Sequence, residues 1–154
     1  MIGNLDRNFD SLNDLMARLE AAPPVKVTQL AQIPSAGGAY VLTERGRAVY
    51  VGVSNSLRKR MRQETSGRPD QSALAFKLAR ERTRRKYEDP QMRSRKELMD
   101  IPQFAEVMNT TTERVKNMEA KCVVIKEMSQ RNLFDLFAAL SLSAPHNDII
   151  ETYF

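Results

Sequence analysis

Two tyrosines and an arginine recur at intervals of ten residues. Tyr40 and Tyr50 stand in two short apolar runs within GGAYVLTERGRAVYVG, residues 37–52, and Arg60 follows in RKRMR. A tyrosine with a lowered pKa can take a proton from water, and an arginine can hold a phosphate through two hydrogen bonds. Taken singly, tyrosines on a hairpin are usually core residues, and an arginine in a basic run usually lies on a solvated face.

Asp135 and Asn147 add polar groups from a second region of the chain. Asp135 is the only charged side chain in the run 133–142, and Asn147 follows it by twelve residues in APHND. One carboxylate is enough for Mg²⁺, because this ion keeps several waters and also takes oxygens of a substrate. A cation, an arginine and a tyrosine base together meet the needs of phosphodiester hydrolysis. Asp135 could instead mark the wet side of an amphipathic helix, and Asn147 could be an ordinary turn residue.

Positive charge is concentrated in one third of the chain. Residues 45–96 hold 16 of the 24 Lys and Arg but only five Asp and Glu, a net charge of +11, whereas the remainder carries −6. Such a block suits a polyanion such as DNA or RNA, although a solvated helix surface has the same composition. We expect phosphate contacts, which give affinity without reading sequence, from eight basic residues: Arg58, Lys59, Arg62, Lys77, Arg80, Arg84, Arg85 and Lys86.

The composition limits the class of protein. The length of 154 residues and a hydrophobic fraction of 42% suit one folded domain. Cys122 is the only cysteine, which excludes an internal disulfide and fits a reducing compartment, and one cysteine with one histidine, His146, makes no zinc cluster. No apolar run approaches twenty residues, and the first stretch is too polar for a signal peptide. We therefore expect a cytoplasmic protein without membrane contact.

The first part of the chain reads as a helix, a hairpin and a second helix. Hydrophobic spacing predicts a helix over 5–21, strands over 39–43 and 48–53, and a helix over 54–64. APPV ends the first helix, and ERGR provides the hairpin turn. Ser54 or Asn55 is the expected cap of the second helix, with Leu57 and Met61 facing inward.

The second part of the chain is mostly helical. The pattern predicts helices over 72–88, within 89–100, over 101–109 and over 110–120, a strand over 121–128 and a helix over 129–143. Thr110 and Glu113 have the spacing of a capping box, and Ser129 is the expected cap of the last helix. The strand is inferred from its β-branched residues.

Gly38-Ala39-Tyr40 and Tyr50-Val51-Gly52 resemble the two motifs of the GIY-YIG nuclease family, at that family's usual separation. NSLRKRMRQ is similar to the helix that follows these motifs, and Arg60 then takes the position of the family's catalytic arginine. The resemblance implies that Gly38 and Gly52 let the strands and the substrate approach closely.

The end of the chain resembles the rest of the same family domain. VVIKEMSQRNLFDLFAALSLSAPHND is similar to its closing strand, metal-site helix and P-x-N end. Asp135 then stands where the family has a metal-binding glutamate, and Asn147 where it has an active-site asparagine. The resemblance covers residues 34–64 and 121–148 and hardly touches 65–120.

The resemblance implies a role for each residue of the site. Tyr40 would be the general base or its partner, and Tyr50 would help to position the attacking water or the phosphate. Arg60 would stabilise charge on the phosphate, and Asp135 would hold one Mg²⁺ or Mn²⁺.

Three positions depart from the family pattern. Asp135 is one methylene shorter than glutamate, Glu64 stands where members often carry His or Tyr, and Val53 stands where some carry Lys. These departures bear on turnover more than on fold.

The expected fold is an α+β domain over 1–154 with a small three-stranded antiparallel sheet flanked by helices. Residues 1–33 form an N-terminal helical extension, 34–64 and 121–148 form a GIY-YIG-like core, and 65–120 form a mostly helical, basic insertion.

The expected function is that of a divalent-metal-dependent endonuclease acting on DNA, and the sequence does not exclude RNA. A second interpretation is a GIY-YIG-like module that binds nucleic acid but no longer cuts it. A third is an interaction protein, in which the amphipathic N-terminal helix docks a partner protein or a second copy as a homodimer.

Overall fold

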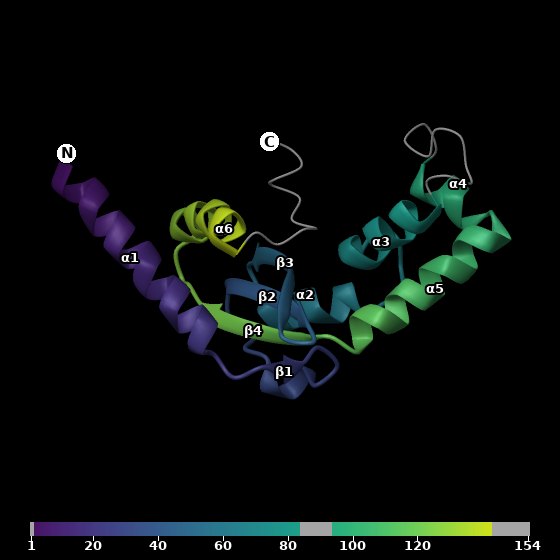
Figure 1. Ribbon diagram of the computed structural model, residues 1–154, viewed down its shortest axis with the longest axis horizontal. Coiled ribbons are helices and arrows are strands. Elements are labelled where there is room, and N and C mark those ends of the chain that lie inside the picture. Colours follow the sequence, from purple (N-terminus) through teal and green to yellow (C-terminus); the bar gives the residue numbers. More distant parts are fainter. Residues whose placement is uncertain (1, 84–93, 143–154) are drawn as a thin grey trace.

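A four-stranded antiparallel sheet forms the centre of the protein in the computed structural model, which describes residues 2–83 and 94–142 (Figure 1). The strands are β1 (Val25–Lys26), β2 (Gly38–Glu44), β3 (Arg47–Ser54) and β4 (Glu119–Val124), in the order β1-β4-β2-β3. The three predicted strands are confirmed, but the expected total of three is wrong. The additional strand β1 pairs only with Ala120 and Glu119, and two residues are too short to give a periodic signal.

The β2–β3 hairpin sets the register of the sheet. Arg45 and Gly46, the two residues of its turn, both have positive φ angles, of 53° and 79°, as a tight hairpin of two residues requires. The register places Tyr40 opposite Gly52 and Leu42 opposite Tyr50. Because side chains alternate along a strand, the two tyrosines lie on the same face of the sheet.

Six α-helices accompany the sheet in the described part of the chain, which makes this an α+β fold. They are α1 (Ile2–Ala21), α2 (Leu57–Glu64), α3 (Ala73–Thr83), α4 (Arg95–Met99), α5 (Pro102–Lys116) and α6 (Met128–Leu142), with a short 3-10 helix η1 (Leu30–Gln32). In Figure 1, α1 and α6 lie at one end of the molecule and α3, α4 and α5 at the other, with the sheet and α2 between them. No helix of the described residues is long and apolar enough to span a membrane.

Each face of the sheet has its own hydrophobic core. On one face, Tyr40, Leu42 and Tyr50 pack with buried residues of α2, α3 and α5. On the other, Ala39 and Val41 pack with buried residues of α1 and α6. The helix α1 packs against the core of the same chain through its buried residues Leu12, Leu15, Met16 and Leu19.

The cap of α2 differs from the expected one. Ser56 is the N-cap residue, and its hydroxyl accepts a hydrogen bond from the Lys59 amide at 3.4 Å. The hydroxyl of Ser54, one of the two expected caps, instead accepts from the Ser56 amide at 3.1 Å. Asn55, the other, is not a cap, because its side chain faces a different helix.

The boundaries of α5 and α6 also differ from the sequence pattern. The two helices expected over 101–109 and 110–120 are one continuous α5, in which the Thr110 hydroxyl donates to the Glu106 carbonyl at 3.1 Å. Thr110 therefore caps no helix, because it lies inside α5, where the preceding turn of the helix supplies the hydrogen-bond partner of its backbone amide. Ser129 is likewise not a cap, since α6 begins one residue earlier, at Met128.

Candidate active site

Tyr40 is a buried residue of β2 that lies against the edge strand β3. Only 1% of it is exposed, and it pairs with Gly52 across the sheet. A Cβ added to Gly52 would stand 2.6 Å from the Tyr40 hydroxyl oxygen and 2.7 Å from its Cζ. The absence of a side chain at Gly52 therefore leaves room for the Tyr40 ring, and a larger residue at this position would displace the ring.

Gly38, the other predicted glycine, serves the packing of the sheet. It is buried between Ser54 of β3 and Val124 of β4. A Cβ at this position would overlap the carbonyl oxygen of Val123. Gly38 is thus enclosed by the neighbouring strands and by the Leu57 side chain of α2.

Arg60 brings a cation to the Tyr40 hydroxyl from α2. Leu57 and Met61 anchor this helix in the core, and Arg60 Nε donates a hydrogen bond to the Tyr40 hydroxyl at 3.2 Å. The Arg60 side chain is 25% exposed, so its guanidinium lies between the core and solvent. Tyr40 and Arg60 are twenty residues apart in sequence, and the fold brings them into contact.

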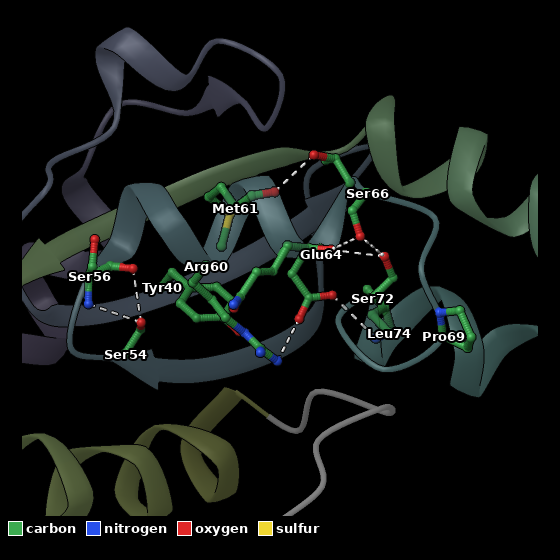
Figure 2. Close-up of polar contacts among 12 residues, drawn as sticks. Tyr40, Ser54, Ser56, Arg60, Met61, Glu64, Ser66, Pro69, Ser72 and Leu74 are labelled. Carbon is green, nitrogen blue, oxygen red and sulfur yellow. Dashed lines mark hydrogen bonds and ion pairs between the residues drawn. The ribbon is translucent and has the colours of Figure 1, made fainter. Parts of the chain in front are cut away.

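Glu64 extends the series of polar contacts that links Tyr40 to Arg60 (Figure 2). Its Oε1 forms an ion pair with Arg60 Nη2 at 2.7 Å, and its Oε2 accepts from the Leu74 amide at 3.2 Å. The Glu64 side chain has no exposed surface. Although burial lowers the pKa of Arg60, the charges of Tyr40 and Glu64 raise it above its ordinary value, so the guanidinium stays charged.

The surroundings of Tyr40 favour its neutral form. Burial is the largest influence and raises the pKa of the hydroxyl well above its ordinary value. The charges of Glu64 and Asp135 raise this pKa further, whereas the charge and hydrogen bond of Arg60 lower it. Tyr40 is therefore a phenol near neutral pH, and additional positive charge beside it would favour the phenolate.

Tyr50 is a packing neighbour of Tyr40. The two ring centroids are 6.1 Å apart, with an angle of 33° between the ring planes. Tyr50 is buried, with 5% exposed, in the core that also holds Met61. The structure thus joins the two predicted tyrosines.

Asp135 lies in the opposite layer of the molecule, within electrostatic range of the same tyrosine. It lies on α6, which packs on β3 and β2, and its Oδ1 is buried. Its charge raises the pKa of Tyr40 and is the smallest of the influences on that pKa. The structure therefore brings Tyr40, Tyr50, Arg60 and Asp135 into one region, while Asn147 lies outside the described residues.

A buried arginine holds α6 in place beside this region. Arg131, one turn before Asp135, donates from Nη1 to the Ile125 carbonyl at 3.2 Å and from Nη2 to Asn55 Oδ1 at 2.7 Å. Asn55 belongs to the loop between β3 and α2. Gly37 leaves space for this arginine, because a Cβ there would overlap Arg131 Nη1. Arg131 thus fixes the helix of Asp135 relative to the helix of Arg60.

Asp135 fits a cation that needs few protein ligands. Among the described residues, no group of three or more His, Cys, Asp and Glu side chains comes together. A divalent ion here would rest on the Asp135 carboxylate, waters and substrate oxygens. That donor set suits Mg²⁺ or Mn²⁺ and does not suit a structural zinc ion.

The predicted nucleic-acid contacts divide into three groups. Arg58 is anchored in the fold, since its Nε donates to the carbonyls of Leu30 and Ile33, each at 3.0 Å. Four residues lie on α2 and α3, the first two exposed and the others half-buried: Lys59, Arg62, Lys77 and Arg80. Three lie outside the described residues: Arg84, Arg85 and Lys86.

Two arginines converge on one aromatic ring at the α3 end of the molecule. The Arg80 guanidinium carbon is 5.7 Å from the ring centre of Phe76, and that of Arg95 is 4.8 Å from it. Arg95 also donates to the Pro69 carbonyl. These contacts gather positive charge beside α3 and α4.

The contact of Glu64 with Arg60 and that of Arg131 with Asn55 were not predicted from the sequence. Glu64 has a readable signal, because it stands four residues after Arg60 on a predicted helix. Arg131 stands four residues before Asp135, but its contact with Asn55 spans 76 residues and leaves no local pattern. Val53, the third departure from the expected pattern, packs half-buried against the core beneath α6.

Comparison with known proteins identifies no matching family model, no matching curated protein and no matching solved structure.

Proposed function

We propose that this protein is a divalent-metal-dependent endonuclease of the GIY-YIG type, acting on DNA. The observation that carries the proposal is the hydrogen bond from Arg60 to the Tyr40 hydroxyl, which lies within electrostatic range of Asp135. A charged arginine, a hydroxyl and a carboxylate from three separate elements are the groups that phosphodiester hydrolysis uses. The sequence motifs around the two tyrosines support the same family.

In this proposal Arg60 and Tyr40 act on the phosphate and on the attacking water. Arg60 stabilises the charge that develops on the phosphate oxygens. Tyr40 acts here as a phenolate, formed when its own proton passes to solvent. Its oxygen takes a proton of the water whose oxygen attacks phosphorus, while the bond to the leaving oxygen breaks and that oxygen takes a proton from solvent. A cation held by Asp135 would supply positive charge for the leaving oxygen and for the Tyr40 phenolate. The Arg60 hydrogen bond favours that phenolate, because it lowers the Tyr40 pKa.

The basic helices would hold the nucleic-acid backbone. Lys59 and Arg62 are exposed on α2, next to the site, and Arg80 and Arg95 gather at α3 and α4. Phosphate contacts of this kind bind without reading sequence, so binding should weaken steeply with added salt.

Cleavage of labelled duplex and branched DNA with Mg²⁺ or Mn²⁺ tests the proposal. We expect metal-dependent cutting by the wild type and its loss in Tyr40→Phe, Arg60→Ala and Asp135→Ala, each of which should still bind DNA at low salt. Absence of cutting by the wild type on every substrate would refute the proposal.

A second candidate is a nucleic-acid-binding module that does not cut. The raised pKa of Tyr40 favours it, because a phenol is a poor general base. Binding without cutting in the wild type, together with metal-dependent cutting by Asp135→Glu, would identify this alternative.

A further inference from the structure

Glu64 is a fully buried carboxylate that contacts two different helices. Its Oε1 is 2.7 Å from Arg60 Nη2 on its own helix α2, and its Oε2 accepts from the Leu74 amide of α3 at 3.2 Å. A buried carboxylate is costly unless it is paired and hydrogen-bonded. The two contacts offset that cost, and they join the site to the first helix of the basic segment.

The contact with α3 falls at the start of that helix. Leu74 is the second residue of α3, where backbone amides lack partners within the helix. A carboxylate is the favoured acceptor there, because the positive end of the helix dipole stabilises it. Glu64 therefore ends α2 and helps to begin α3.

The contact with Arg60 fixes the guanidinium plane. Nε is bonded to the Tyr40 hydroxyl, and Nη2 is paired with Glu64. Two contacts on different nitrogens of a planar group determine its orientation. Nη1 is the nitrogen that these two contacts do not use, and its direction is then set by Glu64 and Tyr40 together.

We propose that Glu64 is a positioning residue, which orients Arg60 toward the scissile phosphate and keeps that arginine in register with the basic helix α3. This inference rests on the proposed nuclease function and adds a residue to its machinery. By this proposal, the helix α3 that would hold the DNA backbone also aligns the arginine that would act on the phosphate.

Ser72 provides a matched control at the same junction. Its side chain is also fully buried, and its hydroxyl donates to the Gln63 carbonyl at 2.8 Å and accepts from the Gly67 amide at 3.0 Å. These bonds stabilise the connection from α2 to α3 without touching Arg60. Ser72→Ala should therefore weaken the junction and leave the orientation of Arg60 intact.

The test compares Glu64→Gln, which removes the charge and keeps an oxygen acceptor, with Ser72→Ala. At saturating DNA and Mg²⁺, we expect Glu64→Gln to lower the single-turnover cleavage rate by roughly 10- to 100-fold, because a misplaced catalytic group loses about that much. DNA affinity should change less than about twofold, and Ser72→Ala should cleave at the wild-type rate. Equal rates in Glu64→Gln and the wild type, or equal losses in Glu64→Gln and Ser72→Ala, would overturn the inference.

A second readout does not depend on cleavage. In isotope-labelled wild-type protein, the Arg60 Nε–H signal should be sharp and slow to exchange with solvent, and it should broaden in Glu64→Gln but not in Ser72→Ala. If the wild type cuts no DNA, the nuclease proposal fails, while this signal still decides whether Glu64 orients Arg60. An unchanged Arg60 signal in Glu64→Gln would overturn the orientation. Should Glu64→Gln fail to fold, Glu64→Asp, which keeps the charge and loses the reach, replaces it.

Discussion

Gly52→Ala tests whether the Tyr40 ring needs the space above β3. The new Cβ would stand 2.6 Å from the Tyr40 hydroxyl oxygen, whereas ordinary contact begins near 3.4 Å. The ring would have to retreat by about 0.8 Å, yet it is packed in the core with only 1% exposed. Its hydrogen bond from Arg60, already 3.2 Å long, would then be broken.

Two losses should follow from this displacement. Overpacking should lower the free energy of unfolding by about 1–3 kcal/mol. Cleavage should fall by roughly 100-fold, since a catalytic group displaced by about 1 Å costs that much. Urea unfolding and single-turnover cleavage, measured well below the melting temperature, report the two quantities separately.

Val41→Ala is the matched control for Gly52→Ala. Val41 is buried on β2, but it faces the other core, beneath α1 and α6. Its truncation should lower stability by about 2 kcal/mol and leave the Tyr40–Arg60 contact intact. If Gly52→Ala were as stable and as active as the wild type, or if Val41→Ala lost as much cleavage, the spatial argument would be refuted.

Two further predictions concern Arg131 and the charge state of Tyr40. Asn55→Ala should lower the free energy of unfolding by about 1–3 kcal/mol, because it leaves the buried Arg131 without its 2.7 Å acceptor. The exposed Asn132→Ala on the same helix as Arg131 should change it by less than about 0.5 kcal/mol, and equal urea midpoints would contradict the argument. The pKa of Tyr40 is raised above its unfolded value of 10.0, so its contribution to stability is present below that pH and is lost as pH rises above it. Between about pH 9 and about pH 11, the free energy of unfolding should therefore fall more in the wild type than in Tyr40→Phe. Equal falls in the two proteins would show that Tyr40 does not titrate in this way.

Local patterns predicted most of the elements. The strands β2 and β3 and the turn at Gly46 follow from two short apolar runs separated by a glycine-containing turn, and the helix α1 follows from its apolar spacing. The strand β1 could not be predicted, because its two residues are held by pairing with β4 rather than by their own pattern. The continuity of α5 was missed because Thr110 offers a cap that the folded chain does not use.

Residue types and spacing indicated which residues to examine as a candidate site, but not the contacts that depend on packing. Tyr40, Arg60 and Asp135 were singled out by residue type, by spacing and by the family resemblance, and the structure places them in one region. The contact between Glu64 and Leu74 depends on how α3 docks on α2, which no interval in the sequence records. The burial that raises the pKa of Tyr40 is likewise a property of the assembled core.

In the proposed function, Arg60 and the groups around it hydrolyse a phosphodiester bond. Single-turnover cleavage of labelled DNA, at saturating DNA and with or without Mg²⁺, tests it in the wild type, in Arg60→Ala and in Arg18→Ala, a loss of equal charge on the exposed side of α1. We predict metal-dependent cutting by the wild type and Arg18→Ala, and a loss of at least about 100-fold in Arg60→Ala. Equal cutting by Arg60→Ala and Arg18→Ala would refute the proposed role of Arg60, and no cutting by any of the three proteins would refute the proposed function.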